Sequence, residues 1–316
     1  MSSALANLFE KIDRRLPGIR LYGIAPPKRA NDPEALARIA ARQAERVRDL
    51  PIDGLVVYDL QDESERTSAP RPFPFLPTVD PEVYADVHLR EVRVPKVVYR
   101  AVHGQSRAHV TEWLDRLAAS SSPRASVLVG APAKWSAGRG FGLSEAYALV
   151  RERAPKLYLG GITIAERHGR SQREHERILE KEDQGCRFFV SQAVYDVTAS
   201  KSLLSDLALA CESAGRAPPP IVVTLSPCGS VRTLELMQWL GIAFPRWLEN
   251  DLRHAGDILE KSMRLCTTIL AELVEYAAEK RLPLGVNVES VSIRQAEIDA
   301  SVELVALTQK LLDRAS

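Results

Sequence analysis

The sequence predicts an α/β protein in which eight parallel strands, each followed by a helix, close into a (β/α)8 barrel. Two observations predict this class. Short β-rich runs alternate with longer helical patterns along the 316 residues, which is typical of parallel βα units. Eight such runs occur, and eight βα units in about 300 residues fit a closed barrel better than an open doubly wound sheet. The open sheet remains the alternative.

The predicted strands are short apolar runs, most of them rich in β-branched or aromatic residues. In chain order they span 19–24, 54–59, 95–100, 126–130, 157–164, 187–192, 220–225 and 283–288. We expect a single domain over residues 1–316, because no linker and no repeat interrupts this order. A short amphipathic helix is expected near the N-terminus, ahead of the first strand.

Two of the predicted helices show their buried faces clearly. Apolar residues recur at helical spacing in 32–50 and in 296–313. Asn31 and Asp32 precede Pro33, which predicts a capped start with proline in the first turn. The residues on the two apolar faces are Leu36, Ile39, Ala40 and Val47 in the first helix, and Ile298, Val302, Val305 and Leu312 in the second.

Composition excludes several classes of partner. The 42 basic and 41 acidic residues nearly cancel, so neither a nucleic acid nor an anionic membrane is expected as a partner. The chain has no apolar run long enough for a membrane span and no signal-peptide pattern, so we expect a cytoplasmic protein. The four scattered cysteines predict free thiols, and no spacing predicts a metal site. A homo- or hetero-oligomer is left open.

Two loops are longer than the fold requires. They span 61–79, with four prolines, and 131–142, with three glycines. Both follow the carboxyl ends of predicted strands, where barrel active sites lie. Each is expected to be either functional or a mobile insertion.

Polar side chains at the carboxyl ends of the strands converge on one mouth if the barrel closes. They carry both signs of charge, which favours a medium-sized polar ligand. In chain order they are Tyr58, Asp59, Gln61, Arg100, His103, Lys134, Glu166, His168, Arg170, Gln192, Tyr195, Asp196, Ser226, Asn287 and Glu289.

The order of several short motifs resembles the methylenetetrahydrofolate reductase family. Ala25-Pro26-Pro27-Lys28 is similar to the family's first-strand motif, and Glu65-Arg66-Thr67 falls where a Glu-Arg pair follows the second strand. Further matches are Glu166-Arg167-His168 after strand five, the segment from Lys181 to Gly185, Ser191-Gln192 with Tyr195-Asp196 after strand six, Leu225-Ser226-Pro227, and Ile242-Ala243-Phe244-Pro245.

This resemblance implies a TIM barrel that transfers a hydride from NADH or NADPH to methylenetetrahydrofolate, directly or through FAD. It also implies that Gln192 hydrogen-bonds the edge of the pterin, a task that suits an amide because it offers a donor and an acceptor side by side. Tyr195 and Asp196 would shape that pocket, with Tyr58, Arg100 and Glu289 as further substrate contacts. Lys134 and Arg170 are the expected cofactor contacts.

Two ionisable groups of the family's machinery are missing. The first-strand glutamate that helps to open the folate imidazolidine ring is replaced by Gly23, and the Arg-Gly-Asp after strand four is replaced by Val129-Gly130-Ala131. The chain therefore resembles the divergent, flavin-independent members more than the flavoenzymes. A folate- or pterin-binding barrel without reductase activity, or with different one-carbon chemistry, is the alternative.

A replacement acid is expected among the remaining strand-end groups. Glu166 is the first candidate because it lies in a family-like motif. The others are Asp59, Glu289, His168 and His103, since burial can bring a carboxyl pKa near neutrality and imidazole titrates there. A structural ion pair with an arginine is the competing role for each carboxylate.

Overall fold

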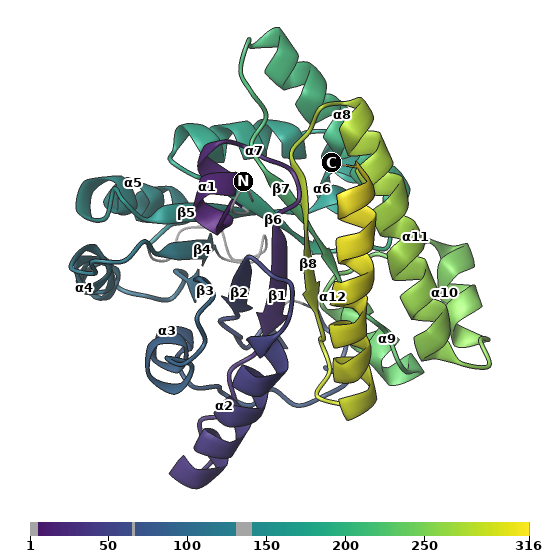
Figure 1. The fold of residues 1–316 in the computed structure, drawn as a ribbon, viewed down its shortest axis with the longest axis horizontal. Coiled ribbons are helices and arrows are strands. Elements are labelled where there is room, and N and C mark those ends of the chain that lie inside the picture. Colours follow the sequence, from purple (N-terminus) through teal and green to yellow (C-terminus); the bar gives the residue numbers. More distant parts are fainter. Residues whose placement is uncertain (1–5, 65–66, 131–140, 316) are drawn as a thin grey trace, which may run out of the picture.

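Eight parallel strands form a closed barrel in the computed structural model, which describes residues 6–64, 67–130 and 141–315 (Figure 1). Each strand pairs with the next one in the chain, and the eighth pairs with the first, so that Gly23 lies beside Glu289. This confirms the (β/α)8 barrel. The open-sheet alternative is wrong, because the first and last strands are hydrogen-bonded to each other.

The strands lie within two residues of the predicted runs. Their bounds are β1 Arg20–Ile24, β2 Gly54–Val57, β3 Lys96–Ala101, β4 Ala125–Val129, β5 Tyr158–Thr163, β6 Phe188–Ala193, β7 Ile221–Leu225 and β8 Leu284–Glu289.

The helices surround this barrel (Figure 1). Their bounds are α1 Leu8–Asp13, α2 Pro33–Arg48, α3 Pro81–Val83, α4 Arg107–Ala118, α5 Leu143–Arg153, α6 Ala165–Ser171, α7 Glu174–Asp183, α8 Val197–Ser213, α9 Val231–Trp239, α10 Arg246–Arg253, α11 Ile258–Glu279 and α12 Gln295–Ala315.

The start of α2 follows the predicted cap. The side chain of Asp32 accepts a hydrogen bond of 2.7 Å from the backbone N–H of Ala35, and Pro33 is the first helical residue. This arrangement satisfies a backbone donor that would otherwise have no partner in the first turn.

Alternate strand side chains fill the barrel interior, and the others pack beneath the helices. The runs are apolar on both faces because both faces of a parallel sheet are covered. The interior cluster includes Leu21, Val56, Val97, Tyr99, Val127, Phe188, Val190 and Val222.

Helix α1 covers the amino end of the barrel. Leu8 and Ile12 belong to the interior cluster, and Leu8 is fully buried. Lys11 anchors the helix, since its Nζ donates to Asp53 at 2.7 Å and to the carbonyl of Gly18 at 2.9 Å. With this end covered, the carboxyl end of the strands is the end available to a ligand.

The long C-terminal helices α11 and α12 lie side by side on the outside of the barrel (Figure 1). Within the described ranges, no helix combines the length and the apolar character that crossing a membrane requires.

Replacing Leu8 with alanine should lower the free energy of unfolding by about 2–5 kcal/mol, because it leaves a cavity under the covered end of the barrel. Urea denaturation followed by circular dichroism measures this change. Leu209→Ala, at a position 58% exposed on α8, is the matched control and should change stability by less than about 0.5 kcal/mol. Equal effects in the two variants would contradict the role of α1 as part of the core.

Candidate functional site at the barrel mouth

A cavity of about 430 Å³ opens at the carboxyl ends of the strands. This volume is within the range of small-molecule sites, roughly 300–1,000 Å³. The polar groups that line it lie after β2, β3 and β5 or within the last residues of β6, β7 and β8. They are Tyr58, Asp59, Gln61, Glu63, His103, Arg167, Arg177, Lys181, Ser191, Gln192, Thr224 and Glu289.

The rest of the cavity wall is apolar or aromatic. The rings of Tyr58 and Tyr99 meet edge to face, with centroids 4.7 Å apart. Such a wall suits a flat ligand ring, which keeps its polar edge for hydrogen bonds. The aliphatic members are Leu128, Val129, Leu143, Ile162, Ile164, Leu240, Ile242 and Val291.

Tyr58, Asn287 and Glu289 form a hydrogen-bonded network at one side of this cavity. Asn287 Nδ2 donates to the hydroxyl of Tyr58 at 2.8 Å and approaches Thr224 Oγ1 at 3.2 Å. The hydroxyl of Tyr58 also acts on the carboxylate of Glu289 and lowers its pKa. Burial, together with the charge of Glu289, holds the pKa of Tyr58 well above its ordinary value.

Glu289 is a carboxyl group that titrates near neutrality. Burial raises its pKa from an ordinary value of 4.5 to about 7, and the hydrogen bond from Tyr58 opposes that rise. A group with this pKa holds a proton in a large share of molecules at pH 7 and can release it to a ligand in the cavity.

The structure explains why β1 carries glycine where the resembling family has a glutamate. A Cβ added to Gly23 would lie 2.7 Å from the ring of Tyr58 and 3.1 Å from Cβ of Glu289. Tyr58 therefore occupies the space beside β1. The adjacent strand β8 places the carboxyl group of Glu289 next to Gly23, the position at which methylenetetrahydrofolate reductases carry a glutamate.

Asp59 also lines the cavity, as expected, but its carboxylate is held by its neighbours. It accepts hydrogen bonds from the backbone N–H of Ala101 at 2.8 Å and from Gln61 Nε2 at 2.7 Å. Burial raises its pKa above the ordinary value, while the Ala101 bond and the charge of Arg100 act in the opposite direction.

Gln192 lines the cavity at the end of β6. The strand register shifts between Val190 and Ala193, a local bulge that lets both Ser191 and Gln192 face the cavity. Gln192 Nε2 donates to the carbonyl of Leu240 at 2.9 Å, so this bond fixes the orientation of the amide. The sequence located the side chain correctly, and its contact with a ligand stays a prediction.

Arg100 does not line the cavity. It follows Tyr99, which faces the interior, so the alternation of strand side chains turns Arg100 outward. There it is buried and bonded to Asp80 at 2.6 Å and to Glu82 at 3.3 Å. The structure gives Arg100 an ion-pair position where a substrate contact was expected.

Tyr195 and Asp196 occupy structural positions. The hydroxyl of Tyr195 donates to the carbonyl of Ser226 at 2.6 Å, and its ring packs on Phe244 with centroids 4.3 Å apart. Asp196 caps α8 by accepting from the backbone N–H of Ala199 at 2.9 Å. Neither residue is among those that line the cavity, where the sequence was interpreted to put them.

The side chains expected from α6 also lie outside the cavity lining. Glu166 is buried in the first turn of the helix, and burial raises its pKa to about 6, with the charge of Asp196 as a smaller cause. Arg170 Nε donates to the carbonyl of Glu166 at 3.3 Å. Of the two expected cofactor contacts, Arg170 is therefore turned to its own helix, and Lys134 lies outside the described residues, as do Glu65 and Arg66.

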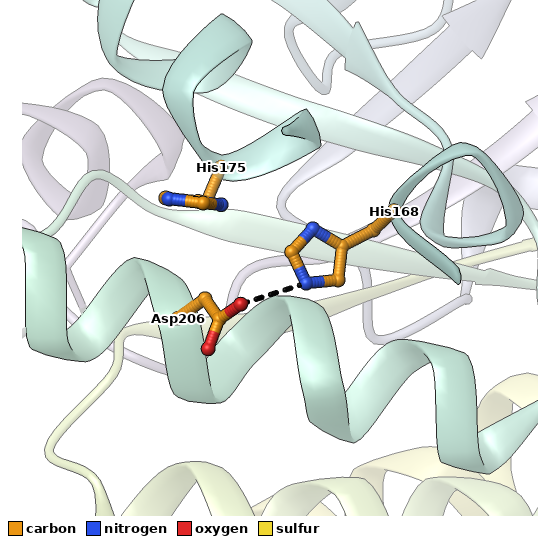
Figure 2. Close-up of side chains that lie close together, drawn as sticks. All are labelled: His168, His175 and Asp206. Atoms are coloured by element: carbon orange, nitrogen blue, oxygen red, sulfur yellow. Dashed lines mark hydrogen bonds and ion pairs between the residues drawn. The ribbon is translucent and has the colours of Figure 1, made fainter. Parts of the chain in front are cut away.

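His168 forms a cluster with two residues that the sequence did not single out. Figure 2 shows His168, His175 and Asp206 facing one another from α6, α7 and α8. His168 Nε2 lies 3.0 Å from Asp206 Oδ2. The absence of a metal site was expected from spacing, but these residues are brought together by helix packing, which spacing along the chain does not reveal.

The sequence also missed a group of cations on one wall of the cavity, Arg167, Arg177 and Lys181. Lys181 Nζ donates to the carbonyl of Ile162 at 2.6 Å, and Arg177 pairs with Glu174 at 3.4 Å. Arg167 and Lys181 both lie in segments that resemble the reductase motifs, so the sequence did contain a signal for them. In the first of these segments the predicted functional residues were Glu166 and His168.

The long loop after β2 is described from 61 to 64 and from 67 onward. Gln61 and Glu63 line the cavity. Further along, the loop packs against α9, where Trp239 Nε1 donates to the carbonyl of Ala69 at 3.0 Å and the guanidinium of Arg71 lies 4.9 Å from the Trp239 ring. Among the described residues of this loop, Gln61 and Glu63 are therefore the ones placed to contact a ligand.

Comparison with solved structures finds proteins similar to this chain over nearly its whole length. A solved structure from Clostridium thermocellum, described as an uncharacterized protein that binds two copies of 5-methyl-5,6,7,8-tetrahydrofolic acid, is 42% identical and superimposes with a TM-score of 0.84. The alignment covers 96% of this chain and 99% of the other. No protein-family model and no curated protein matches, so the resemblance to methylenetetrahydrofolate reductases stays a prediction.

Glu289→Gln should remove a pH dependence of stability. The folded-state pKa of about 7 exceeds the ordinary 4.5, so the folded protein binds this proton more tightly than the unfolded chain does. The wild-type free energy of unfolding therefore loses up to about 3 kcal/mol from this group as the pH rises from about 4.5 to about 7. Urea titrations at several pH values should show that the free energy of unfolding of the variant increases relative to that of the wild type as the pH rises through this range. A difference that is constant with pH would contradict the assignment.

Proposed function

The chain belongs to the same protein family as the Clostridium thermocellum protein, and we propose that its barrel mouth binds a reduced folate and transfers a hydride to the one-carbon unit that this folate carries. The observation that carries the proposal is the position of Glu289, a carboxyl group in the cavity with a pKa of about 7. It lies beside Gly23, the position at which the methylenetetrahydrofolate reductases carry their first-strand acid. The related protein's binding of 5-methyltetrahydrofolic acid supports the choice of ligand.

The cavity's chemistry matches the parts of a folate. The pterin is a flat ring system with donors and acceptors along one edge, which suits the apolar wall together with Gln192 and Asp59. The tail of the ligand ends in carboxylates, and Arg167, Arg177 and Lys181 provide positive charge on one wall of the cavity.

In the proposed reaction, Glu289 protonates the N10 nitrogen of methylenetetrahydrofolate as its bond to the one-carbon unit breaks. A hydride then adds to that carbon, which gives the 5-methyl product. Tyr58 positions the carboxyl group through its hydrogen bond, and Asn287 fixes the tyrosine in turn. The apolar wall keeps water from the reacting carbon.

NADH or NADPH supplies the hydride in this proposal and leaves as the oxidised dinucleotide. Val129 and Gly130, which occupy the positions before the family's aspartate, carry no ionisable group, and Leu128 continues this surface along the cavity wall. A flat nicotinamide ring can lie there without desolvating a charge. These residues therefore fit direct hydride transfer, and FAD is not required by the mechanism.

A folate-binding protein without reductase activity is the second candidate. The absence of a first-strand glutamate at Gly23 favours this function. Tyr58 and Glu289 fill the space beside Gly23, and such packing is consistent with a structural role for both residues. Turnover separates the two functions: a reductase oxidises NADH only when methylenetetrahydrofolate is present, whereas a binding protein shifts its melting temperature with folate and leaves NADH unchanged.

Glu289→Gln should lower kcat for methylenetetrahydrofolate-dependent NADH oxidation by about 100-fold or more, because general acid catalysis contributes roughly 10²–10⁴. The dissociation constant for 5-methyltetrahydrofolate should change only a few-fold. Glu272→Gln on α11, a half-exposed surface position, is the control and should keep full activity. A large loss in Glu166→Gln with full activity in Glu289→Gln would return the acid role to the motif after strand five.

Gln192→Ala should weaken 5-methyltetrahydrofolate binding by about 1–3 kcal/mol, because it leaves polar groups of the buried pterin edge without a partner. Isothermal titration calorimetry measures this loss. Gln184→Ala, which removes an amide at the end of α7, should bind as the wild type does. Unchanged affinity in Gln192→Ala would exclude this amide from the ligand contact.

A further inference from the structure

Three metal-ligating side chains meet outside the barrel mouth. His168, His175 and Asp206 each offer one ligand atom, and these atoms lie within 4.8 Å of one another (Figure 2). The two imidazole rings are arranged edge to face, with centroids 5.4 Å apart. None of the three side chains lines the folate cavity, so this cluster is a separate feature of the molecule.

The hydrogen bonds of the described chain leave this cluster incompletely satisfied. Nδ1 of His168 and Nδ1 of His175 are both buried and lack a hydrogen-bond partner among the described residues. His168 is only 2% exposed. The bond between His168 and Asp206 accounts for one nitrogen of one ring and leaves His175 without a role. Two adjacent imidazoles with buried, unpaired nitrogens are an unusual arrangement, because a buried polar atom without a hydrogen-bond partner destabilises the folded state.

A divalent transition metal would give His175 a partner and would take the place of the hydrogen bond between His168 Nε2 and Asp206. Two imidazoles and one carboxylate, with water at the fourth position, form a frequent zinc ligand set. Tetrahedral bonds of about 2.0–2.1 Å place donor atoms about 3.3 Å apart. His168 Nε2 and Asp206 Oδ2, at 3.0 Å, are already close to that spacing. The three ligand atoms lie within 4.8 Å of one another, so His175 would have to move by about 1–1.5 Å to complete the set. Its side chain is partly exposed.

We propose that His168, His175 and Asp206 form a binding site for one divalent transition-metal ion, with Zn²⁺ as the expected occupant. The ion would replace the hydrogen bond between His168 and Asp206 and connect α6, α7 and α8. Since α6 carries Arg167 and α7 carries Arg177 and Lys181, the same ion would hold together the two helices that supply the positive wall of the cavity. The proposal does not depend on the ligand or reaction proposed for the mouth.

The test uses the full chain without an affinity tag, stripped with a chelator and kept in a phosphine reductant so that the four free thiols stay reduced. Calorimetric titration with Zn²⁺ should give one ion per chain with micromolar or tighter affinity. Titration with Co²⁺ should produce visible absorption bands typical of a four-coordinate ion with nitrogen and oxygen ligands.

His175→Gln and Asp206→Asn are the decisive variants, because these two side chains are partly exposed and neither packs in the core. Each should weaken Zn²⁺ binding by about 100-fold and abolish the cobalt bands. His109→Ala, at an exposed position on α4, should bind as the wild type does. The proposal is overturned if the wild type binds no ion, or if both variants bind it within about fivefold of the wild-type affinity.

Discussion

The hydrogen-bonded pairing of β1 with β8 is the constraint on which the site depends. It closes the barrel and places Gly23 next to Glu289, although the two residues come from opposite ends of the sequence. Tyr58 enters from β2, fills the space above the glycine and bonds to both Glu289 and Asn287. Without closure these side chains would lie at the two edges of a sheet, and no network could form between them.

This network surrounds a carboxyl group whose pKa is raised. A glutamate at the end of a strand in contact with water would be ionised at pH 7, but burial raises the pKa of Glu289 to about 7, and the interaction with Tyr58 limits the rise. Glu289 on the eighth strand pairs with Gly23 on the first strand. Because these strands are neighbours, the two positions face nearly the same part of the cavity.

Helix geometry explains why the side chains of the motif after strand five, Glu166-Arg167-His168, do not all point into the cavity. Successive residues of an α-helix point about 100° apart, so Arg167 can line the cavity while Glu166 and His168 point elsewhere. The sequence predicted that the carboxylate and the histidine of this motif act at the barrel mouth, whereas in the structure neither side chain lines the cavity. His168 then meets His175 and Asp206 from the two following helices, and Asp206 lies too far along the chain for the three to appear as a motif.

By itself, the sequence determined the number, order and approximate bounds of the strands, the cap of α2, and the presence of Asp59, Gln192, Tyr58 and Glu289 at the barrel mouth. These features follow from local periodicity and from the rule that parallel strands present their carboxyl ends together. Only the tertiary structure decided which strand-end side chains turn inward. Arg100, Tyr195 and Glu166 face away because side-chain direction depends on the register of each strand and the packing of each helix, and both are settled only when distant parts of the chain meet.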